Sequence, residues 1–220
     1  MTAYIPLLLS PVLLVLLMLY LKFKFSIKNW KNINTAIVLG AVAVVVLIAS
    51  DYAFEYRWHG VLRNMRRTAA YVFIGIAFAS ELGKFLVLRY AFIKKQLIND
   101  PLDGIIYSFL VGLGFATVAA LLFSFGIIGT DKVRSLELFL WIYPFGTLAF
   151  AIVLGYFVGM GITRKNSFID DSTGLLLATF FHAVFYFCFI TSDIRLLVIT
   201  LIGFAIIGAA LLIRAINLKP

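Results

Sequence analysis

The chain contains seven apolar stretches. Short segments that hold most of the charge separate them. The apolar stretches fall at residues 3–21, 35–52, 69–92, 104–128, 136–159, 172–191 and 195–213. Each is close to the roughly 20 residues that a helix needs to cross about 30 Å of hydrocarbon. The pattern predicts an all-α fold, a polytopic membrane helix bundle with about seven transmembrane helices. Because the second stretch is short and few residues around Asp193 separate the last two, six helices is the alternative.

Composition excludes a soluble globular protein. Of the 220 residues, 63% are hydrophobic and 13% are charged, whereas a soluble domain carries roughly 25% charged residues. We therefore expect one membrane-embedded domain over residues 1–220. The net charge of +9 comes from Lys and Arg that flank apolar stretches and form no basic face, so the expected partner is the lipid bilayer and not nucleic acid.

The positions of the basic residues predict an orientation. In a seven-helix arrangement, the side that holds the C-terminus carries more Lys and Arg than the other side. Since cytoplasmic loops are enriched in these residues, we expect the N-terminus outside and the C-terminus in the cytoplasm. The first stretch has no preceding positive region and exceeds signal-peptide length, which favours a retained helix.

Several polar segments are interpreted as solvated connections. The longest spans residues 51–67 and contains Asp51, Glu55 and His59, and shorter ones of mixed charge lie at 131–137 and 164–171. Cys188 is the only cysteine, so no intramolecular disulfide can form, and its apolar surroundings favour a packing role.

Glu81 and Lys84 interrupt the middle of the third apolar stretch. A charged side chain in hydrocarbon costs at least about 2.5 to 3.5 kcal/mol, so it must be paired, line a cavity or serve a function. Residues three apart share one helix face, which allows a direct ion pair. The pair is either a buried salt bridge that joins helices or part of a polar site.

His182 lies near the middle of the sixth stretch. Taken alone, a buried histidine is more often a hydrogen-bonded helix contact than a ligand. Glu81 is at a similar depth in its own helix, however, so the two side chains can meet in the bundle interior. We therefore expect Glu81, Lys84 and His182 to form one site, with these three as the candidate catalytic residues.

Small residues predict close helix packing. Ser108, Gly112, Ala116, Ala120 and Ser124 recur every four residues in the fourth stretch, and Gly155 and Gly159 form a GxxxG in the fifth. Such faces let helices approach closely.

A cap signal precedes the fourth stretch. Asn99 or Asp100 can cap the helix, followed by Pro101 in the first turn and Asp103 near the positive end of the dipole. The alternative is that these carboxylates steer a substrate.

Three segments resemble the PrsW family of intramembrane proteases, which are relatives of the CAAX prenyl endopeptidases. Residues 80–85, SELGKF, resemble the family's EExxK helix motif. Residues 100–107, DPLDGIIY, with 111–116, VGLGFA, resemble its DPxDGIIYG entry to the FxxxE helix. Residues 181–183, FHA, are similar to its late-helix histidine. The resemblance covers most of residues 69–190, which we treat as a PrsW-like core.

Departures from the family pattern fall at polar positions. Ser80 stands where the first of two adjacent glutamates is expected, and Ala119 and Ala120 stand where a glutamate and an asparagine are expected. Tyr186 occupies a position where relatives often carry asparagine.

The resemblance implies an endopeptidase of the bacterial cytoplasmic membrane that cleaves membrane proteins such as anti-sigma factors, with full, reduced or abolished activity. It implies that Glu81 acts as the base for a water and that His182 or Lys84 acts as its electrostatic partner. A divalent metal ion such as zinc is an open question, because Glu81 and His182 are the only candidate ligands and a catalytic zinc normally has three. The alternatives are a pseudoprotease that binds transmembrane helices and a proton-coupled transporter.

Overall fold

The computed structural model describes residues 2–25, 30–58, 64–129 and 133–218, and all regular structure in these ranges is helical. The elements are η1 (Thr2–Leu8), α1 (Leu9–Phe25), α2 (Trp30–Val42), α3 (Val44–Arg57), α4 (Met65–Ala70), η3 (Tyr71–Phe78), α5 (Ala79–Val87), η4 (Leu88–Ile93), α6 (Pro101–Ser124), α7 (Leu136–Thr163), α8 (Ser167–Thr191) and α9 (Ile194–Asn217). Within the described ranges they form seven helical stretches long and apolar enough to span a membrane. The predicted fold class and count are confirmed, and the chain is a multi-pass integral membrane protein.

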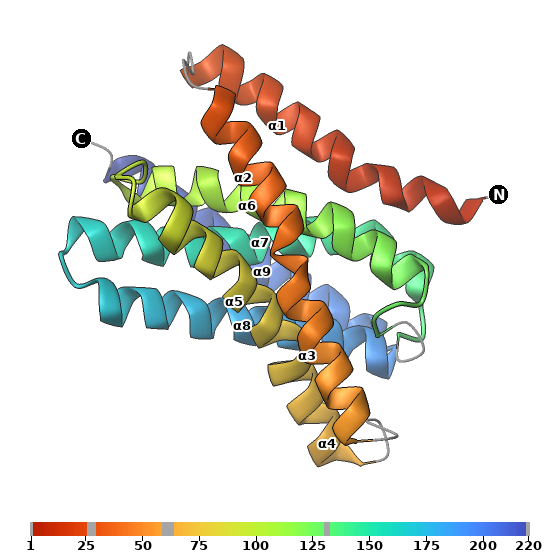
Figure 1. Cartoon of the computed structure of the whole chain (residues 1–220). Helices are drawn as coiled ribbons and strands as arrows, with labels where there is room; N and C mark the ends of the chain where they lie inside the picture. The colour runs from red at the N-terminus through yellow and green to blue at the C-terminus, as the bar shows by residue number, and fades with distance from the viewer. Residues whose placement is uncertain (1, 26–29, 59–63, 130–132, 219–220) are drawn as a thin grey trace.

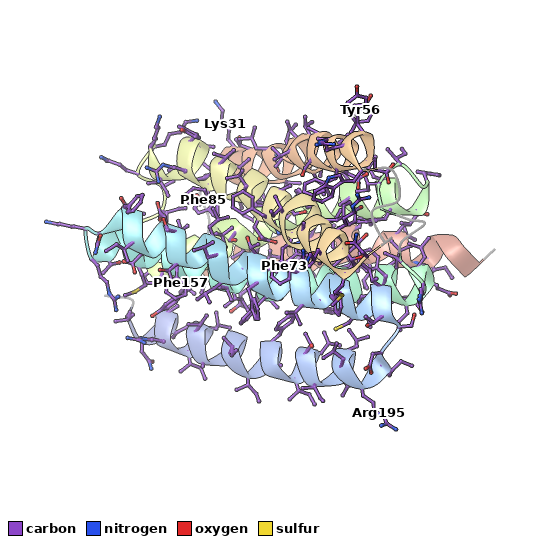
Figure 2. The ribbon with its side chains drawn as sticks, turned by 90° about the horizontal axis from the view of Figure 1, so that it is seen from below. Lys31, Tyr56, Phe73, Phe85, Phe157 and Arg195 are labelled. Atoms are coloured by element: carbon purple, nitrogen blue, oxygen red, sulfur yellow. The ribbon has the colours of Figure 1, made fainter. Side chains whose placement is uncertain are left out.

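Helices α6, α7 and α8 form the centre of the bundle. Figure 1 shows α6 to α9 running nearly side by side, crossed obliquely by α2–α3 and by the span from α4 to η4. Figure 2 shows α9 with Arg195 on one outer side and Lys31 and Tyr56 on the opposite side. In the first and last spans 17% of the apolar window is buried, against 67% in the third and fifth. The outer spans therefore face the lipid, and any site inside the bundle is built from the inner ones.

The second span is longer than the sequence predicts and corrects the interpretation of the polar segment 51–67. It runs over Trp30–Arg57 as one candidate span of 28 residues, with a break at Ala43 between α2 and α3. Asp51 therefore lies inside a helix, is 4% exposed, and accepts a hydrogen bond from the Tyr71 hydroxyl. Glu55 is exposed, and His59 lies outside the described residues.

The third span contains two π-helical segments. Its central piece, α5, is α-helical and carries Glu81 and Lys84, whereas η3 before it and η4 after it are π-helical. Segments of π-helix are rare and frequently accompany functional sites. No pattern in the sequence predicts these two segments.

Glycines bring α6 and α7 into backbone contact. A Cβ added at Gly155 would lie 2.7 Å from the Cα of Ile105, and one at Gly159 would lie 2.7 Å from the nitrogen of Pro101. Gly112 faces Thr147 and Ala151 of α7 at ordinary or slightly tight distances. The predicted close packing through these glycines is confirmed.

This contact leads to a prediction about stability. Leucine at Gly155 would force α6 and α7 apart, and overpacking of this kind typically costs about 1–3 kcal/mol. Gly203 on α9 is a matched control, because a Cβ there meets no atom within 4 Å. We expect Gly155→Leu to lower the midpoint of thermal unfolding in detergent and Gly203→Leu to leave it unchanged or raised. Equal midpoints for the two variants would contradict the packing argument.

The structure confirms the prediction for one acidic segment at a helix start and contradicts it for another. At α6, Asp100 is the cap and accepts a hydrogen bond from the Asp103 nitrogen at 2.7 Å, as capping predicts. At α8, Asp170 and Asp171 are buried inside the helix and do not lie in a solvated turn. Asp171 pairs with Arg89 at 2.9 Å. The interpretation of 164–171 was wrong here because this partner comes from a distant span.

Candidate functional site

The three candidate residues meet at a single carboxylate oxygen. Lys84 Nζ lies 2.6 Å from Glu81 Oε1, and His182 Nδ1 lies 2.8 Å from the same oxygen. Glu81 and Lys84 share one face of α5 because they are three residues apart, and His182 reaches them from α8. The structure thus brings together side chains from the third and the sixth span, as expected from their common depth.

Burial makes this cluster unusual. The side chains of Glu81 and His182 are 0% and 1% exposed, and that of Lys84 is 2% exposed. A charge held away from water is costly unless an opposite charge and hydrogen bonds compensate it. Here the ammonium and the imidazole both approach Oε1, which leaves the carboxylate well compensated on one side only.

Two polar atoms of the cluster have no hydrogen-bond partner among the described residues. They are Glu81 Oε2 and His182 Nε2, and both are buried. Because buried polar atoms are nearly always satisfied, each unpartnered atom points to a missing water or ligand. The site therefore presents one carboxylate oxygen and one imidazole nitrogen to something that is not protein.

Aromatic side chains fix the orientation of the charged groups. The Phe150 ring stacks on the His182 imidazole with centroids 4.7 Å apart and planes 16° apart. Lys84 Nζ lies 5.3 Å from the centroid of the Phe115 ring and 5.9 Å from that of Phe150. A cation over an aromatic face is attracted by the ring quadrupole, so these rings hold the ammonium beside Glu81.

Sequence reasoning missed the contribution of α7. Phe150 stacks on His182, and the Tyr143 ring lies 6.3 Å from the imidazole. Both side chains are fully buried. The only signal in the sequence was the presence of Tyr143 and Thr147 in the middle of an apolar stretch. Such residues are common in packed membrane helices.

The positions that depart from the family pattern add no polar group to this cluster. Ser80 Oγ donates to the Ile76 carbonyl at 2.7 Å, and Tyr186 donates to the Gly129 carbonyl at 3.2 Å. Ala119 and Ala120 are buried. Helix α6 therefore faces the bundle interior with methyl groups at the two positions where a carboxylate and an amide are expected.

The residues present do not fit a metal site. Across the described ranges, no group of three or more His, Cys, Asp and Glu side chains is placed to hold an ion. Glu81 and His182 can offer a metal ion only Oε2 and Nε2, because Oε1 and Nδ1 are hydrogen-bonded to each other. A catalytic zinc normally takes three protein ligands, and the Lys84 ammonium already supplies a positive charge at this carboxylate.

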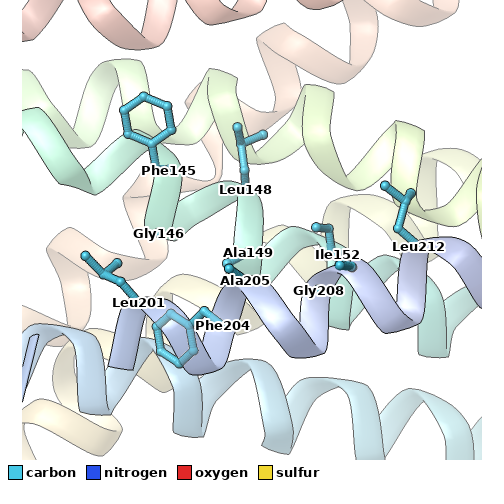
Figure 3. Close-up of a pocket in the computed structure, with 11 residues that line it drawn as sticks. Phe145, Gly146, Leu148, Ala149, Ile152, Leu201, Phe204, Ala205, Gly208 and Leu212 are labelled. Carbon is cyan, nitrogen blue, oxygen red and sulfur yellow. The ribbon is translucent and has the colours of Figure 1, made fainter. Parts of the chain in front are cut away.

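An apolar groove lies on the lipid-facing side of the bundle between α7 and α9 (Figure 3). It is lined by Phe145, Gly146, Leu148, Ala149, Ile152, Leu201, Phe204, Ala205, Gly208, Ala209 and Leu212. The Phe204 ring meets the Phe150 ring edge-on at 5.7 Å, and Phe150 stacks on His182. Two aromatic rings therefore stand between this groove and the buried cluster.

Comparison with known proteins gives one consistent result. A sequence model described as "PrsW family intramembrane metalloprotease" matches residues 28–213. The curated "Protease PrsW" of Oceanobacillus iheyensis is 26% identical over 182 residues, which cover 81% of this chain and 79% of the relative. "Protease PrsW" of Geobacillus kaustophilus is 24% identical over 171 residues, which cover 76% and 70%. No solved structure matches the chain.

Proposed function

The chain belongs to the PrsW family of intramembrane metalloproteases, and we propose that it is an endopeptidase in which Glu81 and His182 activate a water inside the bilayer. The observation that carries this proposal is the hydrogen bond between Glu81 Oε1 and His182 Nδ1, with no partner for Oε2 or Nε2 among the residues that the structure describes. Both side chains of this pair, one from α5 and one from α8, are thus able to hydrogen-bond a water or a substrate at the same place in the bundle.

Hydrolysis at this site needs a base, an electrostatic partner and a fixed geometry. Glu81 Oε2 accepts a proton from the water as the water oxygen attacks the peptide carbonyl carbon. The same proton then passes to the amide nitrogen as the C–N bond breaks, so no further reactant is consumed. Lys84 stabilises the ionised carboxylate through Oε1, and Glu81 together with Phe150 holds the imidazole in place.

The substrate class follows from the location of the site. Glu81 and His182 lie in the middle of their spans and are shielded from water, so the scissile bond must reach them from within the membrane. A transmembrane helix must expose a peptide carbonyl to be cut there, since its backbone is otherwise internally hydrogen-bonded. We propose single-pass membrane proteins, such as anti-sigma factors, as substrates.

The family is described as metalloproteases, but we expect cleavage by this chain not to depend on a metal ion. Because the donor set is two atoms and Lys84 neutralises the carboxylate, we expect elemental analysis of the purified protein to find far less than one zinc per chain. We also expect a chelator to leave cleavage unchanged. Stoichiometric metal that is removed together with activity would contradict this reading of the site.

The direct test is reconstitution. Purified protein in liposomes is incubated with a single-pass substrate, and products are identified by mass spectrometry. We expect a new pair of fragments whose junction lies inside the hydrophobic segment. If the unmodified chain yields no fragments from a panel of such substrates, the proposal of an active endopeptidase fails.

A second candidate function rests on the substituted positions. Since Ser80, Ala119 and Ala120 replace polar residues and the cluster is sealed, the chain can instead bind transmembrane helices without cutting them. In that case photocrosslinking captures a transmembrane segment equally well with the unmodified chain and with Glu81→Gln, and neither gives product. Failure to capture any such segment would exclude this alternative.

A further inference from the structure

One face of α7 is directed at the buried cluster. Tyr143, Thr147 and Phe150 are spaced by four and three residues, which places them on the same side of the helix. The centroid of the His182 ring lies 6.3 Å from that of Tyr143 and 4.7 Å from that of Phe150. Thr147 lies between these two positions, so its side chain faces the same region.

In the described residues the hydroxyls of Thr147 and of Thr179 on α8 lack a hydrogen-bond partner, in contrast to most helical threonines. Six of them donate to the carbonyl four residues earlier, namely Thr35, Thr68, Thr117, Thr163, Thr173 and Thr191. Thr147 is 1% exposed, yet its Oγ1 has no hydrogen-bond partner among the described residues. Its methyl group is directed at Gly112, so the hydroxyl is turned elsewhere. An orphaned hydroxyl in hydrocarbon is costly unless something binds to it.

Tyr143 carries a second hydroxyl on the same face of α7. Tyr143 lies one helical turn before Thr147 on α7, its ring is 6.3 Å from the His182 ring, and the residue is 1% exposed. Two buried hydroxyl-bearing side chains therefore lie on the face of α7 that meets the Glu81–His182 pair. None of these groups comes from α6, where Ala119 and Ala120 occupy the expected polar positions.

We propose that Tyr143 and Thr147 bind the oxyanion of the tetrahedral intermediate, so that α7 supplies the polar groups that α6 lacks. This inference rests on the proposed function. As the water attacks, the carbonyl π electrons move to oxygen, and the new charge accepts hydrogen bonds from the two hydroxyls. When the C–N bond breaks, those electrons re-form the carbonyl. Neutral hydroxyls suit this role because, unlike a further charge, they add no ionic desolvation cost in hydrocarbon.

The kinetic test removes one hydroxyl at a time. Tyr143→Phe and Thr147→Val keep the shape of each side chain, and Tyr156→Phe on α7 and Thr117→Val on α6 are matched controls away from the cluster. We expect each site variant to lower kcat by about 10²-fold, as loss of one oxyanion donor does, with KM within about twofold. The controls should keep the unmodified kcat and KM. Site variants that match the controls while the unmodified chain cleaves would overturn the inference.

A binding test separates this inference from the proposed function. The probe is a transmembrane peptide whose scissile amide is replaced by a phosphinate, which imitates the oxyanion, and the parent peptide serves as reference. We expect Tyr143→Phe and Thr147→Val to weaken phosphinate binding at least tenfold and to leave parent binding unchanged. If the unmodified chain does not cleave but shows this binding pattern, the oxyanion site is supported and the proposed protease activity is not. Phosphinate binding that is independent of both hydroxyls, or no tighter than that of the parent, overturns the inference.

Discussion

Glu81→Gln is expected to lower the rate of substrate cleavage by about 10²- to 10⁴-fold, which is the usual contribution of a general base. The amide has nearly the same shape as the carboxylate, and its oxygen can still accept hydrogen bonds from Lys84 and His182. It cannot take a proton from water, however. The loss should therefore appear in kcat, while KM stays close to that of the unmodified chain. His182→Ala should give a loss of similar size, because it removes both Nε2 and the contact that orients Glu81.

The control for this prediction must separate lost chemistry from lost folding. Glu81→Gln leaves the Lys84 ammonium buried without its counter-charge, so a damaged fold could also abolish cleavage. The double variant Glu81→Gln with Lys84→Met removes both charges and should fold while remaining inactive. The measurement is the initial rate of fragment release in liposomes at matched protein content. A cleavage rate in Glu81→Gln within threefold of the unmodified rate would remove Glu81 from the mechanism.

Much of the fold could be predicted because its signal is local. The length and hydropathy of each apolar stretch are properties of 20 neighbouring residues, and they gave seven spans. Glu81, Lys84 and His182 also stood out locally, since charge and imidazole are rare in the middle of such stretches. Their meeting was inferred from depth alone, which works because helices of one bundle share the bilayer midplane.

The features that were missed depend on distant partners. Asp51 looked like a loop residue because its partner Tyr71 belongs to the next span. Asp171 looked solvated because Arg89 is 82 residues away in the sequence. Tyr143 and Thr147 gave no strong signal, since neutral hydroxyls are ordinary in membrane helices. Only the three-dimensional structure shows that the Thr147 hydroxyl has no partner within the part of the chain that the structure describes.

Lys84→Met is expected to destabilise the protein by about 3–5 kcal/mol, because removing one member of a buried ion pair leaves the other charge uncompensated. Methionine has nearly the length of the lysine stem, so the loss reports on charge more than on packing. The pair is well suited to this effect, since the side chains are 2% and 0% exposed at a separation of 2.6 Å. Lys95→Met, at an exposed position after η4, is the control and should change stability little.

A double-mutant cycle then distinguishes an ion pair from two independent contacts. Glu81→Gln alone should also destabilise, whereas the double variant with Lys84→Met should lose less than the sum of the two single losses, because no charge is left unpaired in it. The quantity measured is the free energy of unfolding in mixed detergent micelles titrated with a denaturing detergent. Additive losses would mean that the two charges do not compensate each other, and the assignment of Lys84 as the resident cation of the site would then be wrong.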